Sequence, residues 1–330
     1  MRPQGYLGRA YASRHAIDLG LPAKLADWSD ADALRALIAH GQDAVGNLLL
    51  GETSRDRFLS EPLGHPVSPN EYVRLAQEAA RGELPGSSAG GEQPKFTAYA
   101  QTPDGPRHVI VKFSEAEVSP VTERWSDILL AEHLAMETLR ADGVGAAQSR
   151  IVDVANQRFL EVERFDRVSE LGRRAVHSLA ALDAEFIGTA TSNWSIITRR
   201  LADEGVIRSD AADGTALLWA FGTLIGNTDM HSGNLSFVAE HGRPYELAPA
   251  YDMTPMAFRP TAGGGLVDAL GAARISADVS NDAWRRAEEL ARTYIARVRS
   301  DPRFSRRFAP CAAAMANHVD AAARQIARLG

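Results

Sequence analysis

Asp229 and Asn234 are the pair of residues whose spacing most directly suggests chemistry. They lie in a polar stretch, 226–234, between the apolar run 217–225 and a short alternating segment, 235–238. Buried carboxylates and amides need partners, so a polar stretch between buried elements predicts groups that are used. An Asp followed five positions later by an Asn suits phosphoryl transfer, in which the carboxylate orients the attacking hydroxyl and the amide holds magnesium. A helix C-cap followed by a turn would favour the same residue types, so the other parts of such a site are needed.

A glycine-rich stretch precedes the first predicted strand. It reads Gly86-Ser87-Ser88-Ala89-Gly90-Gly91-Glu92-Gln93-Pro94-Lys95. Glycines let the backbone approach a phosphate and present amide N–H groups to it, while hydroxyls and an ammonium group add donors. The stretch matches neither a Walker A loop nor the pattern G-x-G-x-x-G. Alone it is compatible with a flexible loop as well as with a phosphate cradle.

Lys112 lies at the end of a second predicted strand. Residues 95–100 and 107–113 form the expected hairpin, with a turn at 103–105. Because an unpaired buried lysine costs several kcal/mol or loses its charge, the run Val109-Ile110-Val111-Lys112 implies an anionic partner. The alternative is a lysine whose ammonium group reaches solvent at the strand end. The order of glycine loop, strand and lysine strand favours the nucleotide-binding interpretation.

Downstream elements supply further candidate parts. Residues 119–141 predict a long helix on which Glu132 could steer the strand lysine, and 151–162 predict a hairpin that ends at a hinge, 163–167. Asp252 follows Asn234 by 18 positions at the end of a short strand, where a second magnesium carboxylate is expected. An Asx turn before Pro255 is the simpler alternative.

The remaining pattern is mostly helical and predicts an α+β, two-lobed, protein-kinase-like fold. Helices are expected at 30–40, 72–80, 178–186, 194–202, 216–225, 282–299 and 305–329, with Asp213-Gly214 separating the two before the polar stretch. Residues 1–167 would form a small mixed α/β N-lobe with the glycine loop, lysine strand and hinge. Residues 168–330 would form a mostly helical C-lobe with the catalytic loop and metal site.

Composition narrows the class of protein. The chain has 330 residues, 45% of them hydrophobic, and a net charge of -6, which disfavours direct nucleic-acid binding. Neither a membrane span nor the apolar core of a signal peptide is expected. With Cys311 as the single cysteine, an internal disulfide is excluded and a cytoplasmic location is predicted.

Taken together, the motifs resemble the HipA-like serine/threonine kinases, the toxin halves of bacterial toxin–antitoxin pairs. The resemblance covers roughly residues 40–260. The matching residues are Ser88-Ala89-Gly90-Gly91-Glu92-Gln93-Pro94-Lys95, Val111-Lys112-Phe113, Val162-Glu163-Arg164-Phe165-Asp166-Arg167, Gly226-Asn227-Thr228-Asp229-Met230-His231 with Asn234, and Pro249-Ala250-Tyr251-Asp252. The early segment Gly41-Gln42-Asp43-Ala44-Val45-Gly46-Asn47 is also similar to the family, less distinctively.

The resemblance implies ATP- and Mg²⁺-dependent phosphorylation of a protein serine or threonine. Asp229 would be the catalytic base, with His231 in the same loop, and Asn234 and Asp252 would hold the metal. The nucleotide would be bound by Ser88, Gly90, Gly91, Lys95 and Lys112, and its adenine by the backbone of Glu163 to Phe165. Autophosphorylation of a glycine-loop serine would fall on Ser88 or the adjacent Ser87. Family targets include aminoacyl-tRNA synthetases, and the expected partner is an antitoxin with a DNA-binding domain.

Two other functions remain open at this point. A metal-dependent phosphohydrolase could use Asp229 and His231 as ligands, although such enzymes usually recruit more histidines than this sequence clusters. A catalytically inactive regulator that binds a nucleotide is the other, and the joint presence of Lys112, Asp229, Asn234 and Asp252 argues against it. One departure from the family is Gly233, where many relatives carry lysine.

Overall fold

The computed structural model describes residues 3, 5–60, 64–81, 93–189 and 191–329. The chain forms two compact units, Met1–Ala116 with Arg150–Val176 and Glu117–Ser149 with His177–Gly330. The boundary expected after residue 167 falls inside the first unit, and residues 117–149, expected in the N-lobe, belong to the second unit. The long helix α5 (Pro120–Ala141) belongs to the second unit because it packs against α9 (Asn281–Ser300) there.

A four-stranded sheet is the centre of the first unit. Its strand order is β1 (Lys95–Thr102), β2 (Gly105–Phe113), β4 (Gln157–Glu163) and β3 (Ser149–Val154), and β2 is antiparallel to both β1 and β4. Side chains alternate between faces of a strand, so Val109, Val111 and Phe113 share one buried face of β2. The hairpin expected at 95–113 is confirmed.

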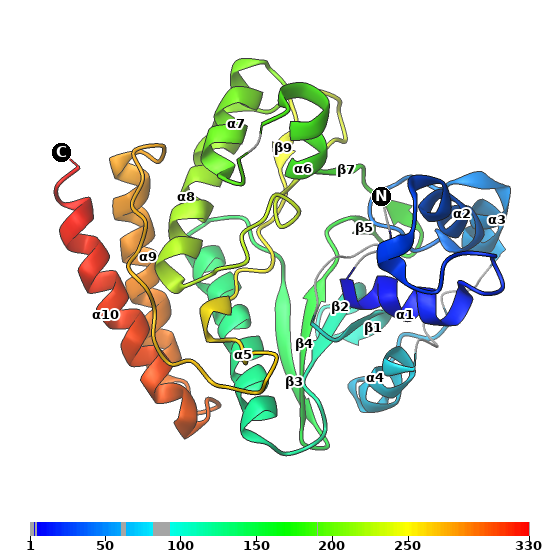
Figure 1. Ribbon diagram of the computed structural model, residues 1–330, viewed down its shortest axis with the longest axis horizontal. Helices are drawn as coiled ribbons and strands as arrows, with labels where there is room; N and C mark the ends of the chain where they lie inside the picture. The colour runs from blue at the N-terminus through cyan, green and yellow to red at the C-terminus, as the bar shows by residue number, and fades with distance from the viewer. Residues whose placement is uncertain (1–2, 4, 61–63, 82–92, 190, 330) are drawn as a thin grey trace. The chain divides into compact units, whose positions relative to one another are not determined.

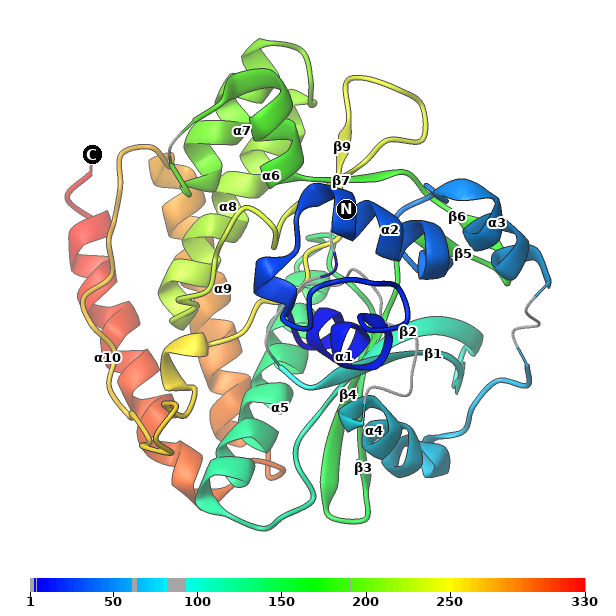
Figure 2. The same ribbon diagram turned by 45° about the vertical axis from the view of Figure 1, so that its right-hand side comes forward.

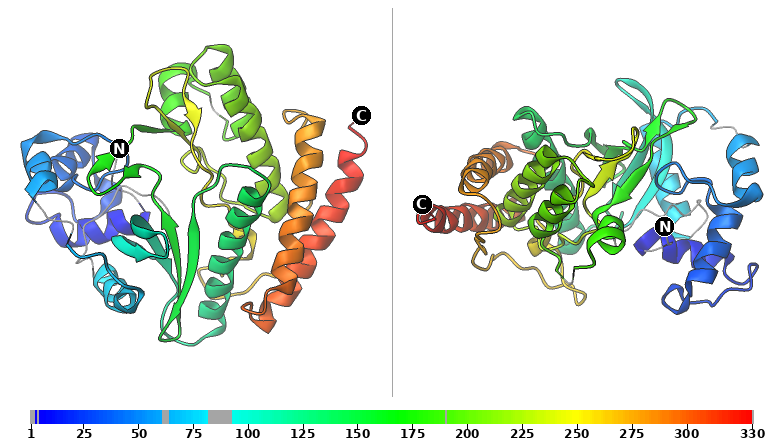
Figure 3. Two further views of the ribbon diagram at one scale, coloured as in Figure 1. Left: turned by 180° about the vertical axis from the view of Figure 1, so that it is seen from behind. Right: turned by 90° about the horizontal axis from the view of Figure 1, so that it is seen from above.

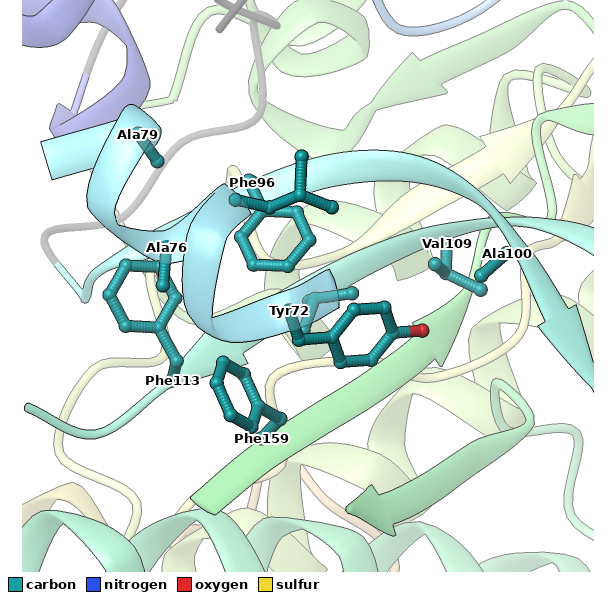
Figure 4. Close-up of a cluster of buried hydrophobic side chains, with 10 residues drawn as sticks. Tyr72, Ala76, Ala79, Phe96, Ala100, Val109, Phe113 and Phe159 are labelled. Atoms are coloured by element: carbon teal, nitrogen blue, oxygen red, sulfur yellow. The ribbon is translucent and has the colours of Figure 1, made fainter. Parts of the chain in front are cut away.

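Helices cover this sheet on the face that carries the aromatic side chains. Tyr72, Ala76 and Ala79 of α4 (Tyr72–Ala80) pack against Phe96, Phe113 and Phe159, as Figure 4 shows. The Tyr72 hydroxyl donates a hydrogen bond to Oε2 of Glu161 at 2.6 Å, which satisfies the polar tip of a fully buried ring. Helices α1 and α4 lie beside β1 in Figure 2. The other elements of the unit are α1 (Gly5–His15), α2 (Asp30–His40), α3 (Gly51–Ser60), α4 (Tyr72–Ala80), the 3-10 turns Leu25–Asp27 and Pro69–Glu71, and the short strands β5 (Arg167–Val168) and β6 (Gly172–Arg173).

Packed helices dominate the second unit. Helix α9 contacts α5, α8 (Ser209–Ile225) and α10 (Ala309–Ile326), and Figures 1 and 3 show α9 and α10 running side by side. The buried side chains of α9 recur at helical spacing, from Trp284 through Ala287 and Leu290 to Tyr294 and Val298, which explains why this segment folds as an amphipathic helix. The elements are α6 (Leu179–Leu182), a π-helical turn (Asp183–Ile187), α7 (Trp194–Asp203), α8 (Ser209–Ile225), α10 (Ala309–Ile326), the strands β7 (Val176–Ser178), β8 (Ser236–Val238) and β9 (Glu246–Leu247), and the 3-10 turns Met256–Phe258 and Arg306–Phe308.

Two details of the helix prediction were wrong. Helix α8 runs from Ser209 straight through Asp213-Gly214, because Ala211 and Thr215 on either side are buried in the same core. The last helix begins at Ala309, after a 3-10 turn, and not at residue 305. Among the residues that the structure describes, no helix is both long and apolar enough to cross a membrane.

Candidate active site

The polar loop that contains Asp229 starts at a glycine cap. Gly226 has a φ of 80°, and its N–H caps α8 by donating to the carbonyls of Gly222 and Thr223. A Cβ at this position would lie 2.8 Å from Cδ2 of Leu270. The left-handed backbone and the close neighbour both require glycine, so the point where the loop leaves the helix is fixed.

Asn227 joins the loop to the segment that carries Asp252. Its side chain is only 5% exposed. Its Oδ1 accepts a hydrogen bond from the Asp229 N–H at 3.0 Å, and its Nδ2 donates to the Asp252 carbonyl at 3.1 Å. One buried amide therefore holds the backbone of both predicted acidic site residues. The sequence prediction did not assign a role to Asn227, although its position directly after the capping glycine was the available signal.

The backbone of Asp229 also orients Asn234. The Asp229 carbonyl accepts hydrogen bonds from the His231 N–H at 3.0 Å and from the Asn234 Nδ2 at 2.8 Å. Because the amide nitrogen of Asn234 is used in this contact, its Oδ1 is the atom that can act as a ligand. Asp229 is half-buried, so its carboxylate can be reached by a substrate hydroxyl.

His231 occupies the space next to Gly233. The Gly233 N–H donates to Nδ1 of His231 at 3.0 Å, so this ring nitrogen is an acceptor and the proton of the neutral ring is on Nε2. A Cβ at position 233 would lie 2.8 Å from Cε1 of the same ring. The glycine that departs from the family pattern thus makes room for His231. Trp194 of α7 also holds the loop, since its indole N–H donates to the His231 carbonyl at 3.2 Å.

Tyr251 and Asp252 complete this part of the site. The Tyr251 hydroxyl donates to the Gly233 carbonyl at 2.9 Å and lies 2.7 Å from Oγ of Ser236. Burial raises the pKa of Tyr251, which keeps the hydroxyl protonated as a donor. Asp252 has a φ of 55°, a strained conformation for a residue with a side chain, and such strain is often found at functional sites.

The donor atoms of this site suit magnesium. Asp252 supplies carboxylate oxygens and Asn234 an amide oxygen, and Mg²⁺ prefers oxygen ligands, of which one or two carboxylates with substrate phosphates and water are sufficient. Among the described residues, no group of three or more His, Cys, Asp or Glu side chains could hold a metal ion. The donor set therefore fits a nucleotide-bound magnesium better than the histidine-rich centre of a phosphohydrolase.

In the first unit, Lys95 and Lys112 lie directly opposite each other. They are cross-strand partners on β1 and β2, and they are 3% and 6% exposed. Directly opposed residues of an antiparallel pair point to the same face of the sheet, so one anion could contact both ammonium groups. Ser87, Ser88, Gly90 and Gly91, also predicted to bind the nucleotide, lie outside the described residues.

The hinge prediction concerns Glu163 and Phe165. Glu163 ends β4, where its carboxylate lies 3.4 Å from Nε of Arg107, and the next residue, Arg164, donates its N–H to the His108 carbonyl. Phe165 is half-buried. Glu132, the expected partner of the strand lysine, is 1% exposed on α5 in the second unit, where its charge adds to burial in raising the pKa of Tyr294.

A buried ionic network holds the hinge residues to the segment 42–46. Arg164 and Arg167 both bind the Asp43 carboxylate, and both also bind Asp166. Arg173 donates to the backbone carbonyls of residues 42, 44 and 46. Burial alone would raise the pKa of Asp43, but the two guanidinium groups hold it well below its usual range. Two motifs noticed separately in the sequence are thus one ionic cluster.

The structure therefore brings Asp229, His231, Asn234 and Asp252 together in the second unit. Asn227, Trp194 and Tyr251 position them, and none of these three was predicted as a site residue. The lysines and the hinge residues belong to the first unit.

Comparison with known proteins gives two family matches. The HipA-like C-terminal domain matches residues 87–325, and the YjjJ-like toxin, middle domain, matches residues 1–59. The chain is 40% identical over 335 residues to Toxin YjjJ of Escherichia coli (strain K12), a match that covers 100% of this chain and 75% of the relative.

Two solved structures show the same fold at low sequence identity. The HipA, HipB and operator DNA complex of the Shewanella oneidensis MR-1 toxin–antitoxin system contains a chain with a TM-score of 0.58 and 16% identity, over 98% of this chain and 85% of that one. The Helicobacter pylori proinflammatory kinase CtkA has a TM-score of 0.51 and 14% identity, over 73% of this chain and 94% of that one. The predicted kinase-like α+β fold is confirmed.

Proposed function

The chain belongs to the HipA-like toxin family, and from that premise we propose that it is a protein kinase that transfers the γ-phosphoryl group of ATP to a serine or threonine hydroxyl. The observation that carries the proposal is the amide of Asn227, which holds the backbone of Asp229 and of Asp252 at 3.0 and 3.1 Å. A structural turn alone would not require a buried amide shared between two acidic residues 23 positions apart.

Each residue has a role that its chemistry supports. Asp229 accepts the proton of the attacking hydroxyl, and the loop hydrogen bonds at its own N–H and carbonyl keep the carboxylate in place. Asn234 and Asp252 would hold magnesium, which when bound neutralises charge on the phosphates. Lys95 and Lys112 bind phosphate oxygens, and the backbone of 163–165 receives the adenine ring. His231 keeps the loop ordered through its contact with Gly233.

Self-phosphorylation provides a means of inhibition. A phosphate on Ser88, or on Ser87 beside it, would add about 1.5 to 2 negative charges next to the position of the ATP phosphates. The nucleotide would then be repelled, so the modified protein would be inactive until the phosphate is removed. These serines precede β1, whose first residue is Lys95.

The partners follow from the family. We propose a cytoplasmic protein substrate, with an aminoacyl-tRNA synthetase as the first to test, and an antitoxin that carries a DNA-binding domain. The support for the antitoxin is that the Shewanella relative is described in complex with HipB and operator DNA. The net charge of -6 favours contact with DNA through such a partner and not directly.

Transfer of radiolabel from γ-labelled ATP tests the proposal. We expect label on the wild-type chain or its target, none with Asp229→Asn, and normal labelling with Asp213→Asn, an exposed aspartate of α8 outside the site. Release of phosphate without protein labelling would favour a phosphohydrolase. Nucleotide binding with neither outcome would favour an inactive regulator, and labelling by Asp229→Asn at the wild-type rate would refute the base assignment.

A further inference from the structure

The segment that follows Asp252 packs against the start of the catalytic loop. We call residues 257–271 the brace. At one end, the Ala257 N–H donates to the Gly226 carbonyl at 3.0 Å, and at the other, Leu270 lies so close to Gly226 that a Cβ there would be 2.8 Å from its Cδ2. The brace therefore touches the point where the loop leaves α8.

Two side chains from flanking helices hold the brace. Arg124 of α5, 2% exposed, donates to the carbonyls of Phe258 at 3.1 Å and Val267 at 3.0 Å and binds Asp268. His318 of α10 lies between the brace and α8: Nδ1 is 2.8 Å from the Gly271 carbonyl oxygen and Nε2 is 3.2 Å from that of Thr223. His318 thus links the end of the brace to the last turn of α8.

The two contacts of His318 depend on its protonation. A neutral imidazole has one N–H and one lone pair, so it can donate to only one of these two carbonyls and places a lone pair opposite the other. The imidazolium donates to both. Its charge is also favoured at the C-terminal end of α8, where the helix dipole is negative.

The charged groups of the packed elements are engaged elsewhere or lie off this contact. On α10, the residues one turn away from His318 are uncharged, and Asp320 pairs with Arg292 of α9, which also pairs with Glu288. On the brace, Asp268 binds Arg124, and Arg259 lies 12 residues before Gly271, at the opposite end; Arg274 follows the brace. The last turn of α8 carries no charge. The two carbonyls are therefore the polar groups that the ring contacts directly.

We propose that His318 is a positioning residue: as the imidazolium it ties the brace to the end of α8, and so holds the catalytic loop and Asp252 in register for transfer. The readout in activity rests on the proposed kinase function. Protonation of His318 strengthens the tie, because the imidazolium donates to both carbonyls, so the contribution of this residue to transfer should be larger at lower pH.

Two substitutions at one position test the tie. His318→Gln keeps an uncharged side chain with a donor group and an acceptor group at every pH, whereas His318→Arg keeps a permanent charge with several donors. We expect the kcat ratio of wild type to His318→Gln to approach about tenfold at the acidic end of a pH series and to decline toward one as the pH rises, since hydrogen bonds to charged groups are the stronger ones. His318→Arg should have a higher kcat than His318→Gln, and the ratio of these two kcat values should stay constant with pH. His241→Gln, on the exposed β8–β9 turn, is the control. A ratio of wild type to His318→Gln that is flat with pH overturns the proposal.

Hydrogen exchange gives a second readout that does not need activity. In the wild type, amide protection of residues 226–236 should fall as the His318 ring, followed by NMR, loses its proton, and in His318→Gln it should be low throughout. Unchanged protection in the variant would overturn the tie even if the protein is an active kinase. Changed protection without any phosphoryl transfer would uphold the tie and refute the proposed function.

Discussion

Replacement of Asn227 by alanine tests the central feature of the candidate site. The substitution removes one hydrogen bond to the Asp229 N–H and one from Nδ2 to the Asp252 carbonyl. Each is worth about 1 kcal/mol, so about 2 kcal/mol of positioning free energy is lost. If this free energy serves to align the carboxylates in the transition state, kcat should fall about 30-fold, since 1.36 kcal/mol corresponds to a factor of ten. Single-turnover transfer from ATP, with binding measured separately, gives this number.

A matched control separates positioning from stability. Thr215→Val removes a buried hydroxyl that donates to the Ala211 carbonyl of the same helix, outside the loop. Its effect on the free energy of unfolding should be about 1 kcal/mol, the value of one such hydrogen bond, with kcat unchanged. Asn227→Asp keeps the acceptor for the Asp229 N–H but places a carboxylate oxygen opposite the Asp252 carbonyl oxygen, so it should lower kcat at least as much as Asn227→Ala. Equal kcat values for Asn227→Ala and Thr215→Val would refute the reasoning.

Three further predictions concern the rest of the molecule. Asp43→Asn removes one of the two carboxylates that Arg164 and Arg167 share and should lower the free energy of unfolding by about 3 kcal/mol. Because the pKa of Asp43 is depressed in the folded state, the wild type should lose this advantage as the pH falls below about 4, and urea titrations at several pH values measure both effects. Burial and the Arg57 guanidinium lower the pKa of His40 to about 4. As the pH falls from about 6.5 to 4, the unfolded chain therefore protonates this imidazole while the folded chain does not. The free energy of unfolding should fall over that range in the wild type but not in His40→Gln, and urea titrations measure it. Gly233→Ala should displace the His231 ring and reduce kcat about tenfold with little change in melting temperature, whereas Gly242→Ala on the distant turn is expected to spare kcat.

The local parts of the site could be predicted from the sequence. The lysine strand, the long helix and the Asp229 to Asn234 interval depend on residues close together in the chain, where alternation, capping and spacing carry the information. The contacts of Asn227 with Asp252 and of Trp194 with His231 join residues 25 and 37 positions apart, and a pattern within one segment does not indicate them.

The same reasoning explains two other differences. Asp43 and Arg164 are 121 positions apart, so the ionic cluster that unites two motifs was not foreseen. Asp213-Gly214 was expected to break a helix, but a glycine in a helix costs only about 1 kcal/mol, and the burial of Ala211 and Leu217 in the core outweighs it.

Each of the two units is assembled from two separate stretches of the chain, and this affects how the protein can be made and divided. On the ribosome, β1 and β2 emerge well before β4, so the first sheet stays incomplete until residues near 163 have been synthesised. Helix α5 waits longer for its packing partner, because α9 begins about 140 residues after α5 ends. A fragment of residues 1–116 would therefore lack β3 and β4 of its sheet, and a fragment of residues 177–330 would lack α5. Neither fragment is suited to separate expression.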